Sequence, residues 1–179
     1  RGLLPSRLFV MESADAGHTW IERREVSRQA GSEFAITGPL VKLAGGALGL
    51  SYEAWKSYDD PAPLDVPALL RISTDGGRTF GPPLTVAQDP AGVLYFWDAR
   101  MSVEPASGEI ISLFWTHDRR AGHDVNIHVA WGTPDGRRWS APQDTGVAGQ
   151  HPTPLALPGG KTLMFYEHRH DPPSLRAVL

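Results

Sequence analysis

A short stretch near the end of the chain gathers side chains that could do chemistry. Glu167 and Arg169 stand two residues apart, a spacing that places both on one face of a β-strand, where they can pair, with Asp171 beyond them. The plainer interpretation is a structural ion pair of little net energy. His168 and His170 also share a strand face and could bind a metal with Asp171, but no further spaced ligand accompanies them, so we expect no metal.

A second candidate site lies between residues 99 and 124. Arg100 carries a planar fork of donors that suits a carboxylate, and Asp124 closes a polar run that contains Arg119 and Arg120. The plainer interpretation of this run is a solvated loop. Aromatic residues accompany both candidate sites, and such residues more often pack between sheets than stack on sugars. They are Trp55, Phe96, Trp97 and Trp115.

The elements that must position these residues recur along the chain. Residues 13–20 and 73–80 fit the pattern Ser-x-Asp-x-Gly-x-Thr followed by an aromatic residue, and residues 133–139 repeat it with one residue missing. Their aspartates, each 60 residues after the last, are Asp15, Asp75 and Asp135. Self-similarity at a fixed period is the signature of a repeat architecture.

Each of these motifs is typical of a turn that joins two antiparallel strands. The aspartate can accept backbone N–H groups of its own turn, and the glycine can take a positive φ without steric penalty. The closing aromatic residue is expected to cover the edge of the unit and bury a large apolar area. Because the third motif is one residue short, we expect its turn to differ.

Strands flank every turn. An alternating strand precedes each motif, at residues 7–12, 68–73 and 126–131. Between motifs the chain repeats a strand, a glycine-containing turn and a stronger strand, at residues 39–52, 102–115 and 154–166. No segment shows sustained helical periodicity. The sequence therefore predicts an all-β fold, a β-propeller of four-stranded antiparallel blades. The alternative, a β-sandwich, would not explain the strict period.

The repeats amount to about three blades, half of a six-bladed ring. We divide residues 1–179, a single partial propeller, into a partial blade at 1–29, blades at 31–89 and 94–146, and a partial blade at 150–179. Propellers close with at least four blades, so three cannot form a ring alone. We favour a fragment of a longer chain. The alternative is a homodimer that completes a six-bladed ring, because exposed strand edges invite pairing.

The repeated turns resemble the Asp boxes of the sialidase (neuraminidase) superfamily and related BNR-repeat proteins, over essentially the whole chain. The resemblance implies that the boxes lie on outer turns away from the substrate and that their aspartates are structural. It implies a carbohydrate ligand with a terminal acidic sugar, held by three arginines. It also implies an aspartate acid/base and a tyrosine nucleophile paired with a glutamate. It slightly favours a secreted or periplasmic location, although the chain begins with no signal-peptide pattern.

Two places match part of the family's site. Arg100 stands where the family has the arginine of an Arg-Ile-Pro pattern, which implies a clamp on the sugar carboxylate, and Asp124 stands where it has the proton donor. Glu167 and Arg169, followed by Asp171, resemble the family's Phe-Ala-Glu-x-Arg stretch and its following aspartate. The resemblance therefore implies that these five residues are catalytic.

The sequence also departs from the family pattern. His117 stands where the glutamate of the first stretch is expected, and no proline follows Arg100. No full arginine triad and no nucleophilic tyrosine can be identified. We therefore keep two hypotheses: a glycoside hydrolase of the exo-α-sialidase type that acts on terminal acidic sugars, and a non-catalytic BNR-repeat propeller that binds a glycan or a protein partner.

Composition narrows the class of ligand. The net charge of −3 argues against a nucleic-acid partner, because phosphate binding usually shows as a basic excess, whereas a few arginines suffice for an acidic sugar. No apolar stretch approaches the roughly 20 residues that a membrane helix needs, so we expect no membrane partner. The absence of cysteine excludes disulfides and thiolate metal sites, and we expect no cofactor.

Overall fold

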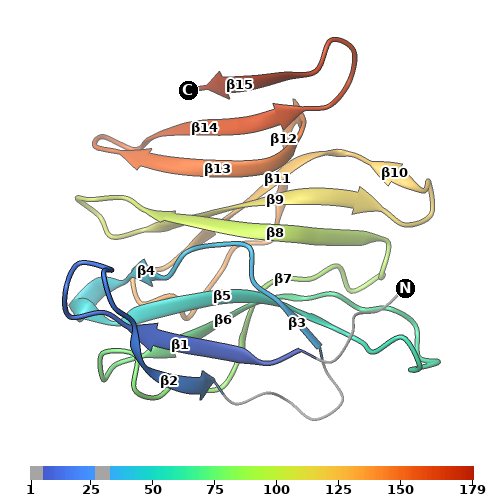
Figure 1. Cartoon of the computed structure of the whole chain (residues 1–179). Coiled ribbons are helices and arrows are strands. Elements are labelled where there is room, and N and C mark those ends of the chain that lie inside the picture. Colours follow the sequence, from blue (N-terminus) through green and yellow to red (C-terminus); the bar gives the residue numbers. More distant parts are fainter. Residues whose placement is uncertain (1–5, 27–32) are drawn as a thin grey trace.

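Successive side chains point to opposite faces of a β-strand, and this protein uses that alternation to stack four antiparallel sheets in chain order (Figure 1). The computed structural model describes residues 6–26 and 33–179. The outer parts of the predicted segments 1–29 and 31–89 that fall beyond those ranges lie outside the described residues.

Apart from the short strands β4 and β10, the strands follow one another within each sheet as they do along the chain. The first sheet contains β1 (Leu8–Glu12) and β2 (Ile21–Val26). The second contains β3 (Glu33–Ala35), β4 (Val41–Lys42), β5 (Leu48–Trp55), β6 (Ala68–Ser73) and β7 (Leu84–Ala87). The third contains β8 (Leu94–Val103), β9 (Ile110–Asp118), β10 (His123–Asp124), β11 (Asn126–Gly132) and β12 (Gln143–Ala148). The fourth contains β13 (Gln150–Leu157), β14 (Lys161–His168) and β15 (Ser174–Val178).

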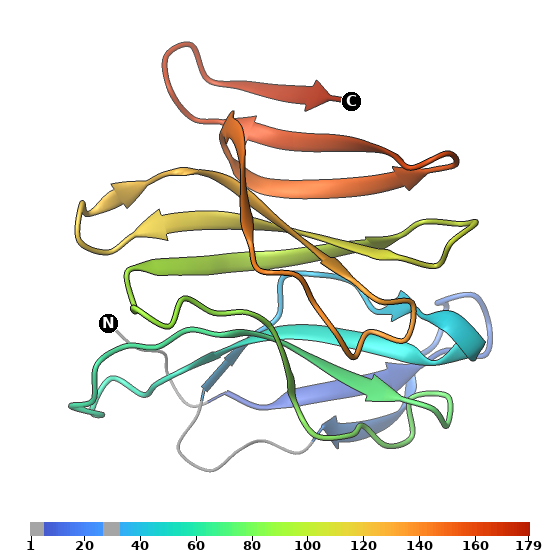
Figure 2. The ribbon, with the colours of Figure 1, turned by 180° about the vertical axis from the view of Figure 1, so that it is seen from behind.

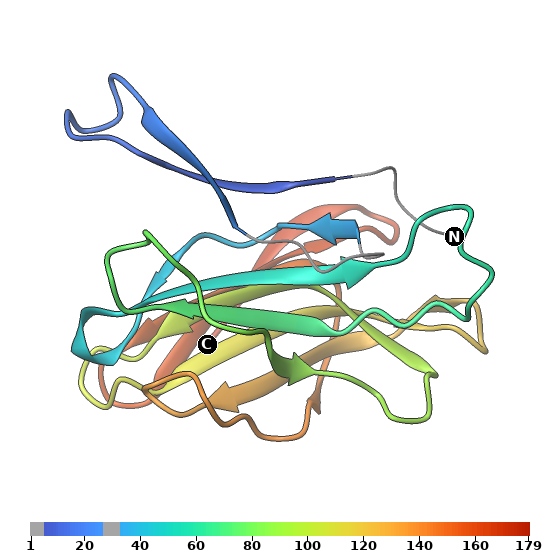
Figure 3. The same cartoon turned by 90° about the horizontal axis from the view of Figure 1, so that it is seen from below.

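The second and third sheets each have a four-strand plan. In the second, β3 and β4 both pair with β5 and together take the place of a first strand. In the third, β10 is a short addition to β9. Figure 2 shows the same stacking from behind, and Figure 3 shows the β1–β2 pair lying to one side of the rest. The all-β prediction is confirmed: the one helical element in the described residues is the single turn Ala44–Gly46, and no helix there could cross a membrane.

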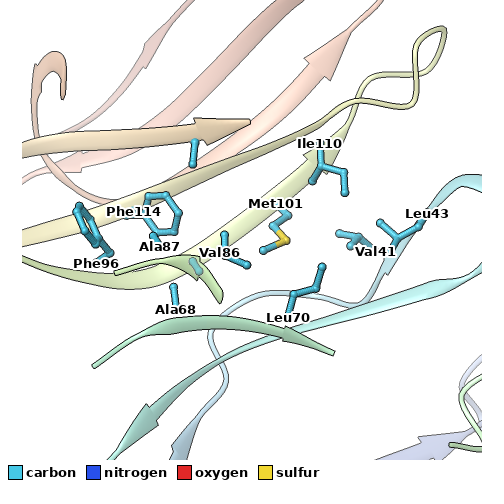
Figure 4. Close-up of a cluster of buried hydrophobic side chains, with 12 residues drawn as sticks. Val41, Leu43, Ala68, Leu70, Val86, Ala87, Phe96, Met101, Ile110 and Phe114 are labelled. Carbon is cyan, nitrogen blue, oxygen red and sulfur yellow. The ribbon is translucent and has the colours of Figure 1, made fainter. Parts of the chain in front are cut away.

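The two middle sheets are buried on both faces because neighbouring residues point to opposite sides. Leu113 packs with Met164 of the fourth sheet, whereas Phe114 packs toward the second sheet. Leu69 and Leu70 divide in the same way between the first and third sheets. Figure 4 shows the cluster between the second and third sheets. Full burial of one such side chain stabilises the fold by roughly 2 kcal/mol, so the packing between sheets contributes most to the stability of the fold.

The repeated turns join the third and fourth strands and are built around their aspartates. Asp75 accepts hydrogen bonds from Thr79 N (2.9 Å), Thr79 Oγ1 (2.6 Å) and Ser73 Oγ (2.8 Å), and Gly77 N donates to Ser73 Oγ at 2.8 Å. The first motif makes the same bonds around Asp15. These donors favour the ionised carboxylate, so the pKa of Asp15 falls to about 2 and that of Asp75 also lies well below its usual range.

The third turn differs, as expected from its missing residue. Asp135 accepts only from Thr133 Oγ1 (2.5 Å) and Arg137 N (3.1 Å) within the described chain. Gly136 has φ +71°, and a Cβ there would lie 2.9 Å from Leu70 Cδ2. Only glycine therefore allows this turn to approach the core of the second sheet.

The expectation that each closing aromatic residue is buried is wrong for Trp20, which is 58% exposed. Phe80 packs on the cluster shared with the first sheet, and Trp139 packs on the cluster shared with the second. Phe80 and Trp139 thus each pack against the sheet before their own. In the described residues no sheet precedes β1–β2, so Trp20 has no surface to cover.

The hydrogen bonds of the turns predict which aspartate substitution destabilises the protein more. We expect Asp75→Ala to lower the urea midpoint of unfolding by more than Asp135→Ala, because it leaves more donors of its turn without their acceptor. Urea titration followed by tryptophan fluorescence measures both midpoints. Equal losses in the two variants would contradict the structural role given to the complete motif.

Candidate functional site

Polar and aromatic side chains collect at the end of the sheets opposite to the repeated turns. Leu48 at the start of β5 pairs with Ser73 at the end of β6, so the turn after β6 lies far from Glu53 at the other end of β5. The ends of β5, β9 and β14 and the starts of β8 and β13 lie together on the right of Figure 1. This end of the sheets is the candidate site.

The first strands of the third and fourth sheets, β8 and β13, carry matching irregularities at this end. The pairing register of β8 slips around Asp98 and that of β13 slips around His151. Both residues have positive φ, 52° and 46°. A left-handed backbone costs a residue other than glycine on the order of 1 kcal/mol, and a residue before a proline, here Pro152, normally stays extended. The two strained residues meet: His151 Nε2 lies 3.0 Å from Asp98 Oδ2.

His151 connects this contact to the predicted pair at the end of β14. Its Nδ1 lies 3.2 Å from Glu167 Oε2 and 3.1 Å from Arg169 Nη2, so it donates to the carboxylate when protonated and accepts from the guanidinium when not. Arg169 Nε donates to Glu167 Oε2 at 2.9 Å. Arg169 and His151 together lower the pKa of Glu167. Glu167 and Arg169 therefore do pair, as one part of a larger network.

Asp124 joins the same end of the sheets through β9 and β13. His117 Nδ1 lies 2.8 Å from Asp124 Oδ1, and Gln150 Nε2 donates to Asp124 Oδ2. Gln150 directly precedes His151. Asp124 and Arg169 both line a small cavity of about 80 Å³. The structure thus brings three of the five predicted residues, Asp124, Glu167 and Arg169, into one neighbourhood.

Arg100 lies one step further along β8. Its Nη1 donates to Thr153 Oγ1 at 2.8 Å, so Arg100–Thr153 and Asp98–His151 are successive links between β8 and β13. The Nε of Arg100 is buried and has no hydrogen-bond partner in the described chain. A donor in that position calls for an explanation, such as an acceptor that arrives with a ligand.

Asp171 stands apart from the cluster. It is exposed and makes no hydrogen bond or ion pair with residues 6–26 or 33–179. The rings of His168 and His170 meet edge to face at 5.3 Å, but no three histidine, aspartate or glutamate side chains of the described residues come together as a metal site.

Glu53 also belongs to the cluster, although the sequence analysis did not identify it as a site residue. It is 3% exposed, its Oε2 accepts from Trp55 Nε1 at 3.1 Å, and its Oε1 accepts from the backbone amide of Asp98. Burial, aided by the nearby Asp98 charge, raises the pKa of Glu53 to about 7 despite these donors. A buried carboxyl with this pKa changes charge near neutral pH.

The three tryptophans at this end of the sheets, Trp55, Trp97 and Trp115, pack against neighbouring rings. Trp97 stacks nearly parallel to Trp55 at 6.0 Å and to His117 at 5.0 Å. Trp115 meets the ring of His151 edge to face at 4.9 Å. The packing interpretation of these aromatics therefore holds, although Trp97 and His117 also line a cavity of about 440 Å³. Two basic residues, Lys56 and Arg119, line the same cavity, and its described lining contains no carboxylate.

Sequence reasoning did not single out Asp98, His151 or Glu53, and it noted His117 only as a departure from the family pattern. One signal could have found the first two: aligning the strand that contains Arg100 with the strand that contains Thr153 puts Asp98 and His151 at one repeat position. A titratable residue at the same place in two repeats is a stronger hint than either residue alone.

Comparison with known proteins adds fold-level information. No family model matches the chain, and no curated protein matches it. Among solved structures it is similar to a protein of unknown function from Dyadobacter fermentans, with 21% identity and a TM-score of 0.76 over 94% of this chain and 46% of that one. It is also similar to a leech intramolecular trans-sialidase complexed with 2,7-anhydro-Neu5Ac, with 14% identity and a TM-score of 0.57 over 95% of this chain and 28% of that one.

These likenesses indicate a sialidase-like fold, and the chain spans less than half the length of either protein. At such identities they establish the fold alone. What the site of this chain does must be argued from its own residues.

The titration of Glu53 gives a prediction for stability. A carboxyl whose pKa rises from 4.5 to about 7 on folding stabilises the fold below pH 4.5, and that contribution is lost as the pH rises through 7. The loss amounts to roughly 3 kcal/mol. Glu53→Gln removes this titration, so its free energy of unfolding, relative to the unaltered protein, should rise by roughly that amount between pH 5 and pH 8.

Chemical denaturation at a series of pH values measures this difference. Glu104→Gln is the control, because the pKa of Glu104 is lowered by hydrogen bonds from the backbone amides of Ser107 and Ala106, so its contribution changes only at more acidic pH. If the difference in free energy of unfolding between Glu53→Gln and the unaltered protein stays constant from pH 5 to pH 8, the prediction is wrong and Glu53 titrates normally.

Proposed function

We propose that this chain forms part of a sialidase-like glycoside hydrolase that acts on a terminal acidic sugar at the cluster around Asp98 and His151. The observation that carries the proposal is the contact between these two residues, which are held in left-handed conformations by matching irregularities in adjacent sheets. Backbone strain of this kind persists where the surrounding structure enforces it, and it concentrates at functional sites.

The finer fold belongs to the same proposal: the four sheets are blades of an Asp-box propeller, with β8 and β13 as inner strands. Three features support it: the stacking of sheets in chain order, the 60-residue period of the turns, and the likeness to a trans-sialidase. In a propeller the inner strands surround a central channel where ligands bind. Asp98, Arg100 and His151 would then border that channel.

An acidic ligand is supported by the charges that the cluster leaves free. Asp124, Glu167 and Asp98 each have a histidine partner within the cluster. Arg100 has no carboxylate partner in the described residues, and a guanidinium is well suited to bind a sugar carboxylate through two parallel bonds. The neighbouring cavity with Lys56 and Arg119 adds positive charge for the same ligand.

Binding tests the choice of sugar. We expect 3′-sialyllactose to bind and lactose, which lacks the acidic sugar, to bind at least tenfold more weakly, since a charge-assisted contact contributes about 1.5–3 kcal/mol. Arg100→Gln should remove that preference. Arg137→Gln is the control, because Arg137 is exposed in a turn at the opposite end of the sheet. Calorimetric titration that finds equal affinity for both sugars would sink the proposal.

A second candidate, a non-catalytic propeller that binds an acidic glycan, is favoured by two observations. Both oxygens of Asp124 are engaged within the chain, Oδ2 by Gln150 Nε2 and Oδ1 by His117 Nδ1 at 2.8 Å, so neither is left free to face a leaving group. Two tyrosine hydroxyls are already engaged, that of Tyr52 by Arg71 Nε and that of Tyr95 with the Leu64 carbonyl, and none in the described residues bonds to a glutamate.

Hydrolysis separates the two candidates. If the chain is an enzyme with Asp124 as proton donor, Asp124→Asn should reduce release of the acidic sugar from a fluorogenic sialoside by 100-fold or more while 3′-sialyllactose still binds, because general acid catalysis is worth about 10²–10⁴-fold. Binding without any hydrolysis by the unaltered protein would favour the non-catalytic propeller.

The outer face of the fourth sheet supports the incomplete ring. Phe165 occupies the repeat position of Leu113 and is 49% exposed where Leu113 is 3% exposed. Leu175 occupies the position of Ile127 and is 85% exposed where Ile127 is fully buried. We propose that a further blade covers this face, either from a longer chain or from a second copy in a homodimer.

Light scattering distinguishes the two sources. If a second copy covers the face, the molar mass should be twice the 19.5 kDa of one chain, and Phe165→Glu should return it to a single chain because it places a charge in the apolar contact. Tyr58→Glu is the control, since Tyr58 is also exposed but lies in the loop after β5. A single-chain mass for the unaltered protein would contradict the two-copy ring.

A further inference from the structure

Glu53 is a buried charge-bearing group whose bonds cross from one sheet to the next. It sits near the end of β5 in the second sheet, yet its Oε1 accepts from the backbone amide of Asp98 in the third sheet. Desolvating a carboxylate is unfavourable, so a carboxylate kept at 3% exposure needs compensating hydrogen bonds. It finds them in Trp55 Nε1 and the Asp98 amide.

The irregularity in β8 explains why the Asp98 amide bonds to Glu53. Where the register slips, the extra residue leaves the ladder and its amide loses its usual partner. Glu53 supplies an acceptor for that amide. A positive φ at Asp98 also requires surroundings that hold it, because the same residue would relax to an extended backbone if it were free.

We propose that Glu53 is a positioning residue: by accepting the Asp98 amide it holds Asp98 in its left-handed conformation and so directs the Asp98 carboxylate at His151. The claim about geometry stands on the contacts alone. Its meaning for ligand binding rests on the function proposed above. Glu53 itself is too buried to touch a ligand and acts through Asp98.

The neighbouring repeat supports this role. Trp115 in β9 occupies the position of Glu53, since each directly follows a buried aromatic residue, Phe114 and Tyr52 respectively. Trp115 contacts His151, which is the counterpart of Asp98 in the next sheet. At the same place in two repeats, a second-strand residue therefore braces the irregular first strand of the following sheet, once through a hydrogen bond and once through a ring contact.

The test reads His151 directly by NMR of its side-chain nitrogens. We expect Glu53→Ala to move the Nε2 resonance of His151 to the value seen in Asp98→Asn, and the double variant to show no further change. Glu53→Gln keeps an oxygen that can accept the Asp98 amide, so it should stay close to the unaltered protein. Ser51→Ala is the matched control: Ser51 is buried on the same strand and bonds to the Ala99 carbonyl at 3.3 Å, not to the Asp98 amide.

Hydrogen exchange of the Asp98 amide in the unaltered protein provides a measurement that needs no variant. Strong protection supports the proposal, and exchange at the rate of an exposed loop amide overturns it. A folded Glu53→Ala protein with an unchanged His151 resonance overturns it as well, as does a Ser51→Ala protein with the same shift as Glu53→Ala.

Affinity for 3′-sialyllactose separates this inference from the proposed function. We expect Glu53→Ala and Asp98→Asn each to weaken binding by about tenfold, the value of one hydrogen bond to a charged group. If the His151 resonance moves in both variants but affinity does not change, Glu53 still positions Asp98 and the sugar site lies elsewhere.

Discussion

Burial of both faces of the second and third sheets is the constraint on which the rest of the structure depends. Phe114 and Leu113 are adjacent, yet each is buried against a different neighbouring sheet. A strand used in this way has little room for charge along its middle, because an unpaired buried charge is strongly unfavourable. The charged groups within these strands are accordingly held by specific partners: Arg71 in the middle of β6 bonds to Tyr52 Oη and the Gly81 carbonyl, and Asp98 within β8 contacts His151. The aspartates of the repeated turns lie at one end of the sheets, and the Asp98–His151 cluster lies toward the other, so the turns and the candidate site are separated along the strands.

The candidate site depends on a second constraint, that the first strands of adjacent sheets slip in register at the same level. If β8 and β13 were regular strands, the side chains of Asp98 and His151 would not point toward each other. With the slips, the two side chains meet, and Arg100 bonds to Thr153 one step away. The strain of two left-handed residues is offset by contacts from their neighbours, Glu53 on one side and Trp115 on the other. The site is thus assembled between sheets, and no single sheet contains it.

Much of the fold could be read from the sequence because its causes are local. In the motif at Asp75, the hydrogen bonds of the turn join residues only four positions apart. The spacing of the residues alone therefore predicts the turn. The pairing of Glu167 with Arg169 was equally local. By contrast, the conformation of Asp98 depends on Glu53, 45 residues away in another sheet, and no local pattern encodes it. The prediction that Trp20 is buried was wrong for a related reason: burial of a closing aromatic depends on the preceding sheet, which the motif does not specify.

The charge pattern of the cluster bears on what it can bind. Four carboxylates near one another would repel an acidic ligand if they stood alone. Here Asp98, Asp124 and Glu167 are each held by a contact with a histidine ring, and Glu53, buried with a pKa near neutrality, carries only part of a charge. Arg169 pairs with Glu167 at 2.8 Å and offsets its charge. Arg100, with a buried Nε that lacks an acceptor in the described residues, then stands as a cation without an anion. At Arg100 this arrangement supports the acidic ligand proposed above, which would bring the missing carboxylate.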